Sequence, residues 1–445
     1  MQLGHGWPPF YENNLWFELG CLIFFRKLFG VLCLLWVSTA FACEIPFRNF
    51  NKTYCLTPIA NESNGVNQTS DVYSVSGKAL QVSLSNRLIV RASGLTKLSL
   101  QALDSRIAAV NELYLMPESN YYLVTLNTRD QLSAVMKVLS STSNISLVQP
   151  DILQLTIRTD TGRTNTEDQQ LALNPAPYFS QLDIPTLWQT TKGRGVKVAV
   201  IDDGFALSHE ELRFTDVVFS YDAERKVQDV SPKSELDIHG TKVVGTIFAA
   251  HDERGIDGIA PEAGLIAIRN SDTWTSRTLL SFYLAKLSNA DIINASWASQ
   301  WLLDPLADIV SDLAQNGRAG KGIAVVFSAG NAGLELTADA SEASLLDAVV
   351  VGAADEHGKR TRFSNYGSSV DAYIYGKPSP AIKAGGGYGH FSGTSLSAAV
   401  ASGYFALLLS ATPSLTLDQL VSQLQIAQFG SQVIPSSTPI HLRDL

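Results

Sequence analysis

Four polar residues occupy positions in the chain where catalytic groups are commonly found. Asp202 directly follows a continuous apolar run, His239 opens a predicted helix, and Asn331 ends another apolar run inside a glycine-rich turn. Ser395 follows a Gly-Thr pair at the point where a loop turns into a long apolar helix. Together these residues supply an acid, a base, an amide donor and a nucleophile, which are the groups that nucleophilic catalysis by a serine requires.

Each of these residues alone has a simpler structural explanation. A serine at a helix start is usually a capping residue, and an asparagine in a glycine-rich turn is usually there for its left-handed conformation. Asp203 is also close enough to compete with Asp202 for the role of the acid. Four such residues in one chain make the catalytic interpretation stronger than these separate explanations.

The elements that would position the four residues are strands and helices in alternation after residue 173. Between the strands, Thr278–Leu287 and Pro305–Gln315 read as helices. Buried strands that alternate with helices predict an α/β fold, a mainly parallel sheet with helices on both faces, and active-site groups belong at the carboxyl ends of its strands. The predicted strands are Val196–Ile201, Leu265–Ile268, Ile292–Ala295, Ile323–Ser328 and Ala348–Val351.

Residues 72–158 predict a separate, small α+β domain of the ferredoxin-like kind. Thr128 and Gln131 have the spacing of a capping box that opens a helix. Strands and helices alternate here within a short length, which is typical of an open-faced α+β fold. The predicted elements are a strand at Asn86–Ala92, a helix at Leu98–Leu113, a strand at Tyr121–Asn127, a helix at Asp130–Leu139 and a strand at Ile145–Ile152.

The first 42 residues read as a signal sequence. Arg26-Lys27 precedes the apolar run Leu28–Val37, and Ala40-Phe41-Ala42 has the form of a cleavage site. The run is shorter than the roughly 20 residues that span a bilayer, so no stable membrane span is expected after processing. We therefore expect a secreted or periplasmic, extracytoplasmic protein. Lipid modification of Cys43 and a true start downstream of Met1 stay open as alternatives.

Two further segments read as linkers, over 43–71 and 159–173. The first contains an Asn- and Ser-rich stretch, and the second is polar, exposed and a suitable processing region. Cys43 and Cys55 can form a disulfide in an exported protein, and no zinc-ligand spacing occurs in the sequence. The net charge of -9 without a basic stripe argues against nucleic acid as a partner.

The motifs after residue 173 resemble those of the subtilisin-like serine protease family, the subtilases. The resemblance covers about Asn174 to Leu424, and the upstream α+β unit resembles the inhibitory propeptide of that family. The four motifs that carry it are Ile201-Asp202-Asp203-Gly204, His239-Gly240-Thr241-Lys242-Val243-Val244-Gly245, Ala329-Gly330-Asn331 and Gly393-Thr394-Ser395. Their order, with the acid first and the serine last, is that of the family.

The resemblance implies an exported serine endopeptidase that is made as a zymogen, processes itself and acts on proteins or peptides. Its own propeptide, residues 72–158, would be a partner in cis, and residues 174–445 would be the catalytic domain. No cofactor is required for the chemistry; structural calcium is common among relatives, but no site can be assigned. The implied roles are the triad Asp202, His239 and Ser395, the oxyanion donor Asn331, and substrate binding by Ser296, Trp297 and Ala298.

Three residues depart from the family pattern and keep a second hypothesis open. Lys242 replaces a second histidine, Ala298 stands where a glycine is usual, and Ala399 replaces a proline. A positive charge at Lys242 would disfavour protonation of His239 if solvent did not screen it. The alternative is therefore a catalytically silent, subtilisin-like binding protein.

Overall fold

The computed structural model describes residues 43–59, 72–154, 156–157, 175–337 and 341–428. The predicted signal sequence and the whole of the predicted processing linker, 159–173, lie outside these residues, as do residues 60–71 of the first linker. Residues from Cys43 onwards belong to one compact unit. Within it, we refer to residues 43–157 as the N-terminal region and to residues 175–428 as the catalytic region.

The catalytic region is built on a seven-stranded sheet in the order β10-β11-β9-β13-β15-β16-β17. All neighbouring strands in it are parallel, which confirms the predicted sheet. Each predicted buried strand is present within a few residues of its expected bounds. The strands are β9 (Lys197–Asp202), β10 (Asp216–Asp222), β11 (Gly264–Arg269), β13 (Ile292–Ala295), β15 (Ala324–Ser328), β16 (Val349–Ala354) and β17 (Ala372–Tyr375).

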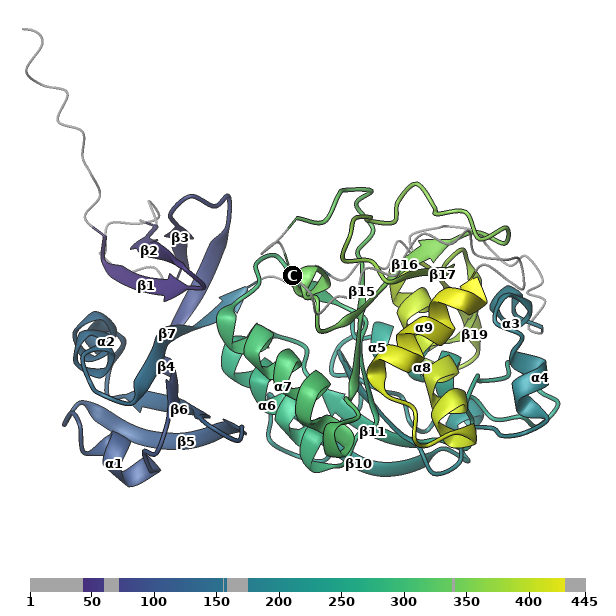
Figure 1. Ribbon diagram of the computed structural model, residues 1–445, viewed down its shortest axis with the longest axis horizontal. Helices are drawn as coiled ribbons and strands as arrows, with labels where there is room; N and C mark the ends of the chain where they lie inside the picture. Colours follow the sequence, from purple (N-terminus) through teal and green to yellow (C-terminus); the bar gives the residue numbers. More distant parts are fainter. Residues whose placement is uncertain (1–42, 60–71, 155, 158–174, 338–340, 429–445) are drawn as a thin grey trace, which may run out of the picture. The chain divides into compact units, whose positions relative to one another are not determined.

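Helices cover both faces of this sheet (Figure 1). Along β9, Val198 and Val200 enter the core that also contains residues of α5 (His239–Phe248) and α8 (Thr394–Ala411). Ala199 and Ile201 enter the opposite core, beside α6 (Thr275–Leu287) and α7 (Asp304–Gly320). This alternation is the two-residue period of a strand that is buried on both sides. Helix α8 is long and apolar enough to cross a membrane, but 83% of its residues are buried, as expected for the central helix of a globular core.

Shorter elements complete the catalytic region. Helix α9 packs on β17 and α8, and a two-stranded antiparallel sheet of β18 and β19 leads into α8. The bounds are α3 (Pro177–Gln181), α4 (Ile184–Trp188), β12 (Thr273–Trp274), β14 (Ala298–Ser299), β18 (Ser379–Ile382), β19 (Tyr388–Phe391) and α9 (Leu417–Gln428).

The N-terminal region is an antiparallel sheet with two helices. Its strands run in the order β1-β2-β3-β4-β6-β5, and β7 also pairs antiparallel with β4. The capping box of Thr128 and Gln131 is confirmed at the start of the second helix. The elements are β1 (Ile45–Asn49), β2 (Lys52–Pro58), β3 (Val72–Val75), β4 (Gln81–Ala92), α1 (Lys97–Gln101), β5 (Ile107–Leu115), β6 (Asn120–Leu126), α2 (Leu132–Ser140), β7 (Ile145–Gln154) and β8 (Thr156–Ile157).

Two segments of the N-terminal region differ from expectation. Residues 98–113 form the short helix α1 and most of strand β5 instead of one long helix. The register of β5 against β6 shifts twice, and these bulges bury Ile107, Val110 and Leu113 at a spacing that imitates a helix. In the predicted linker 43–71, β1 and β2 form a hairpin, and the alternating burial along Ile45–Asn49 is that of a strand.

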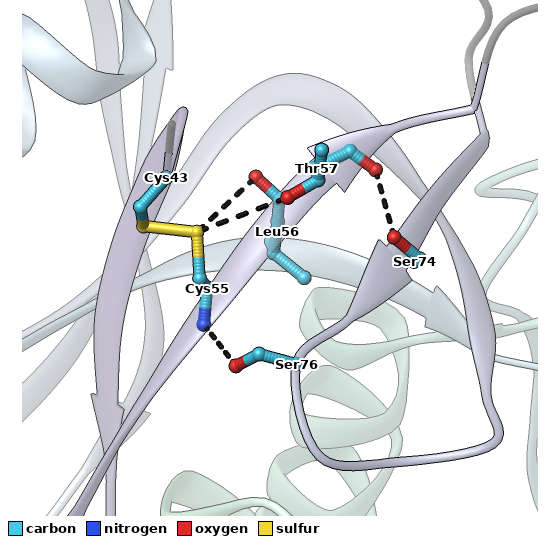
Figure 2. Close-up of a disulfide and its surroundings, with 6 residues drawn as sticks. All are labelled: Cys43, Cys55, Leu56, Thr57, Ser74 and Ser76. Carbon is cyan, nitrogen blue, oxygen red and sulfur yellow. Dashed lines mark hydrogen bonds between the residues drawn. A yellow bond between two sulfur atoms is a disulfide. The ribbon is translucent and has the colours of Figure 1, made fainter. Parts of the chain in front are cut away.

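The predicted disulfide between Cys43 and Cys55 is confirmed, with 5.5 Å between the two Cα atoms. It joins Cys43, two residues before β1, to the middle of β2, and the Cys55 backbone N–H donates to Ser76 Oγ at 2.8 Å (Figure 2). The disulfide therefore closes the open end of the first hairpin of the sheet.

Candidate active site

Asp202 and His239 form a buried pair at the carboxyl end of the interior strand β9. His239 is the first residue of α5, and its Nδ1 lies 2.9 Å from each oxygen of the Asp202 carboxylate. The exposed fractions of Asp202 and His239 are 1% and 2%, and the Phe391 ring packs edge-on against the imidazole at 5.5 Å. Because Nδ1 donates to Asp202, the lone pair of a neutral His239 lies on Nε2, as a general base requires.

The neighbouring Asp203 has a different task. Its carboxylate oxygens accept the backbone N–H of His239 at 3.1 Å and of Gly240 at 2.8 Å. These N–H groups belong to the first turn of α5, where backbone N–H groups have no acceptor within the helix. Asp203 therefore fixes the helix that carries the histidine, and it is Asp202 that contacts the ring.

Gly240 allows the close approach of α5 to the end of β9. A Cβ atom at Gly240 would lie 2.6 Å from Gly204 O and 2.9 Å from Asp202 Cβ. The glycine of the His-Gly-Thr motif is therefore required by the contact between helix and strand.

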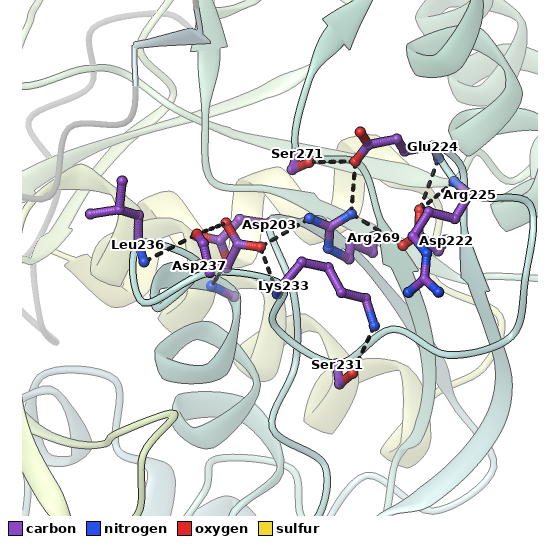
Figure 3. Close-up of polar contacts among 12 residues, drawn as sticks. Asp203, Asp222, Glu224, Arg225, Ser231, Lys233, Leu236, Asp237, Arg269 and Ser271 are labelled. Carbon is purple, nitrogen blue, oxygen red and sulfur yellow. Dashed lines mark hydrogen bonds and ion pairs between the residues drawn. The ribbon is translucent and has the colours of Figure 1, made fainter.

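A buried arginine supports the loop that precedes His239 (Figure 3). Arg269 is the register partner of Asp202 on the adjacent strand β11, and its guanidinium contacts Asp222 at 3.1 Å and Asp237 at 2.9 Å. Burial opposes the charge of Asp237, but hydrogen bonds from Arg269 and from the Lys233 backbone N–H outweigh it and lower the pKa of Asp237. This network ties the segment before His239 to the sheet, and nothing in the local sequence around Arg269 indicated it.

Ser395 is the second residue of α8 and is fully buried. Its hydroxyl donates to the Ser296 carbonyl at 3.0 Å, and the Ser296 hydroxyl donates to Asn294 Oδ1 at 2.9 Å. A serine hydroxyl has a single proton to donate, which here goes to Ser296 and not to His239. Of the expected site residues, Ser296 is therefore in direct contact with the predicted nucleophile, and Asn294 was not anticipated.

Asn331 is held beside the start of α8 by Thr394. Its Oδ1 accepts from the Thr394 backbone N–H at 2.9 Å and from the Thr394 hydroxyl at 3.0 Å. Gly393 has a φ of 90°, and a Cβ there would lie 2.6 Å from Asn331 Nδ2. The Gly-Thr-Ser sequence thus fixes the amide next to the helix N-terminus, where backbone N–H groups and the helix dipole favour negative charge.

The expected substrate-binding residues have divided roles. Ala298 and Ser299 form β14, which pairs antiparallel with Ile157 and Thr156 of β8. Trp297 faces the core instead: its indole N–H donates to Ile201 O at 2.8 Å, and 4% of the residue is exposed. The indole therefore points into the core, and substrate binding by the segment that contains Trp297 stays a prediction.

A buried glutamate supports β14. The Glu342 carboxylate accepts the Ser299 backbone N–H at 2.7 Å and the Ser299 hydroxyl at 2.6 Å. Burial raises the pKa of Glu342, and the two hydrogen bonds from Ser299 partly offset that effect. Glu342 was not anticipated, because its contact is with a residue more than 40 positions away in the sequence.

The three departures from the family pattern lie close to the site. Lys242 is 7% exposed, and its Nζ lies 6.0 Å from the centre of the Phe391 ring, the ring that also packs on His239. Ala399 is fully buried in α8. Among the described residues, no group of three or more His, Cys, Asp or Glu side chains could hold a metal ion.

Comparisons with known proteins show which family the chain resembles. A family model described as "Subtilase family" matches residues 193–429. Subtilisin NAT from Bacillus subtilis subsp. natto is 31% identical over 258 residues, covering 56% of this chain and 65% of that protein. A Subtilisin from Bacillus pumilus is also 31% identical over 56% of this chain, with 90% of that protein covered. A "Calcium-dependent protease" from Trichormus variabilis is 27% identical over 346 residues, and the match covers 68% of this chain and 52% of that protein. The chain thus spans less than two thirds of two of these relatives.

Proposed function

This chain belongs to the subtilase family, and on that premise we propose that it is an exported serine endopeptidase, made as a zymogen, that hydrolyses peptide bonds through an acyl-enzyme. One observation carries the proposal: the buried Asp202–His239 pair lies at the end of β9, and Ser395 and Asn331 meet at the start of α8. Four groups suited to acyl transfer are thereby held by rigid elements.

In the first step, Ser395 Oγ attacks the carbonyl carbon of the scissile peptide bond. The hydroxyl must turn away from Ser296 O so that its proton passes to His239 Nε2. Asp202, which accepts from Nδ1, keeps the ring in position and stabilises the imidazolium that forms. His239 then gives the proton to the departing amine, and water repeats the sequence to release the acyl group.

The negative charge on the tetrahedral intermediate would be stabilised by Asn331 Nδ2 and by the Ser395 backbone N–H. Because Thr394 occupies Asn331 Oδ1, the amide can present its N–H groups to the oxyanion without a competing rotamer. One such donor contributes about 10² to 10³ in kcat, a range that comes from subtilisin itself.

The zymogen part of the proposal is supported by the N-terminal region. Its β7 pairs with β12 and its β8 pairs with β14, so the chain occupies the edge that an extended substrate would use. Asp151 accepts from the Ser276 backbone N–H and hydroxyl, both at 2.8 Å, at the start of α6. Cleavage within 159–173 would cut the covalent connection between the two regions, and export would place the enzyme outside the cytoplasm.

No cofactor is needed for these steps. The name of one relative mentions calcium, and no group of three or more His, Cys, Asp or Glu side chains that could hold a metal ion occurs in the described part of the chain.

The test uses a fluorophosphonate probe, which labels only a nucleophilic serine. Processed wild type should be labelled, and Ser395→Ala should not. Equal labelling of both proteins would refute the proposal. The alternative, a catalytically silent binding protein, draws on buried Lys242, which lies three residues after His239 on α5. Casein hydrolysis that a serine-protease inhibitor abolishes would exclude it.

A further inference from the structure

A tryptophan of the catalytic region is buried inside the core of the N-terminal region. Trp301 is 0% exposed and belongs to the same apolar cluster as Ile45, Phe47 and Leu56. Its rings lie 5.7 Å from Phe47 and 4.8 Å from Tyr54, both on the β1–β2 hairpin. A fully buried tryptophan at such a contact is the kind of side chain that usually dominates binding energy.

The same contact contains a buried amide that connects the two regions. Asn49, at the end of β1, is 1% exposed; its Nδ2 donates to Leu302 O at 3.0 Å and its Oδ1 accepts from Asp304 N at 2.8 Å. Gln154 Nε2 donates to Trp301 O at 2.7 Å. Separating the regions would leave these polar groups without their partners until water replaced them, so the contact is specific as well as apolar.

This contact around Trp301 and Asn49 is distinct from the pairing of β7 with β12 and of β8 with β14. Trp301 follows β14 by two residues and precedes α7, so the hairpin holds the loop next to the strand that pairs with β8. Strand β1, which carries Phe47 and Asn49, lies at the edge of the sheet with β2 as its strand neighbour, and the disulfide supports this pairing because it restricts the unfolded states of the hairpin. Cys55 is the register partner of Pro46, and its backbone is tied to Ser76 of the next turn (Figure 2).

We propose that the disulfide-closed hairpin Ile45–Pro58 is a redox-dependent clamp on the loop Trp301–Asp304. It keeps the N-terminal region bound to the catalytic region after the chain between them has been cut, so cleavage alone does not open the cleft. A dithiol reductant releases the clamp: the S–S bond breaks, Cys43 and Cys55 each gain one electron and one proton, and the dithiol is oxidised to a disulfide. The control of peptide hydrolysis by the clamp rests on the proposed function, whereas the binding of the N-terminal region to the catalytic region does not.

The experiment tests the clamp separately from the proposed peptidase function. It uses the full chain with Ser395→Ala and with a site for a sequence-specific protease inserted within 159–173. After cutting, the dissociation constant of the two fragments is measured by size-exclusion chromatography over a dilution series. Trp301→Ala and Tyr54→Ala should each weaken binding at least about tenfold. Dithiol treatment, or Cys43→Ser with Cys55→Ser, should also weaken it at least about tenfold.

Thr53→Ala is the matched control, because Thr53 is exposed on the same hairpin and should change binding less than about twofold. Tyr54→Ala leaves the catalytic region unaltered, so the test stands even if Trp301→Ala fails to fold. Dissociation constants within about twofold of the parent for Tyr54→Ala and for the reduced protein would overturn the clamp. In the active chain, weakened binding without any gain of peptide hydrolysis would refute the proposed function and leave the clamp intact.

Discussion

The adjacent carboxylates Asp202 and Asp203 allow the site assignment to be tested by a matched pair of substitutions. Asp202→Asn replaces the carboxylate that holds the imidazole by an amide, which can hold the ring in the wrong tautomer, and Asp203→Asn alters the acceptor for the first turn of α5. Both side chains are fully or almost fully buried, so solvent does not screen either effect. The two variants are therefore expected to fail in different ways.

The magnitudes follow from the hydrogen bonds. Asp203 accepts two N–H groups, and an asparagine retains one acceptor oxygen, so Asp203→Asn loses one bond to a charged acceptor, about 1.5–3 kcal/mol of unfolding free energy. Its kcat/KM should fall less than about tenfold, because the Asp202–His239 contact remains. Asp202→Asn should lower kcat by about 10⁴, the effect of the same change in a serine triad on an unrelated fold.

The assay has two parts. Urea unfolding is followed in a Ser395→Ala background, where self-digestion cannot interfere, and hydrolysis of a chromogenic peptide is followed with the active serine present. Both precursors are cut at an inserted protease site, so that neither depends on its own processing. A large loss of activity with unchanged stability for Asp203→Asn, together with near-normal activity for Asp202→Asn, would show that the roles are reversed.

Two further substitutions test other parts of the site and fold. Asn331→Ala should lower kcat of the processed enzyme by about 10² to 10³ with little change in KM, because only the developing oxyanion uses this donor; a change confined to KM would contradict the role. Asp371→Asn tests a carboxyl whose pKa burial raises to about 7. The folded protein keeps that proton up to about pH 7 while the unfolded chain loses it near pH 4, so unfolding free energy should fall by up to about 4 kcal/mol as pH rises through this window. In the Ser395→Ala background, Asp371→Asn should flatten that slope between pH 5 and pH 8, and an unchanged slope would refute the interpretation.

The parts of the fold that the sequence predicted are those with a strong local signal. The strands of the central sheet are continuous apolar runs, because helices bury both of their faces. Asp202 and His239 stand in short motifs whose glycines are needed for close packing, as at Gly240. Such catalytic candidates can be recognised in a sequence because the close packing of the backbone requires the glycines next to them.

The parts that the sequence did not predict depend on contacts between distant segments. Arg269 and Glu342 act on residues far away in the chain, and no periodicity marks them. Strand β5 was mistaken for a helix because bulges changed the spacing of its buried residues. The motif around Trp297 predicted a substrate-binding segment but did not indicate that the indole of Trp297 points into the core.

The most direct test of the central claim is N-terminal sequencing of the exported protein, wild type beside Ser395→Ala. We predict that the wild type shortens to a fragment that begins between Thr159 and Asn174, while Ser395→Ala keeps the N-terminal region and is cut only when wild-type enzyme is added. Identical shortening of both proteins, with no fluorophosphonate labelling of the wild type, would contradict the proposal that Ser395 is the nucleophile of a self-processing peptidase.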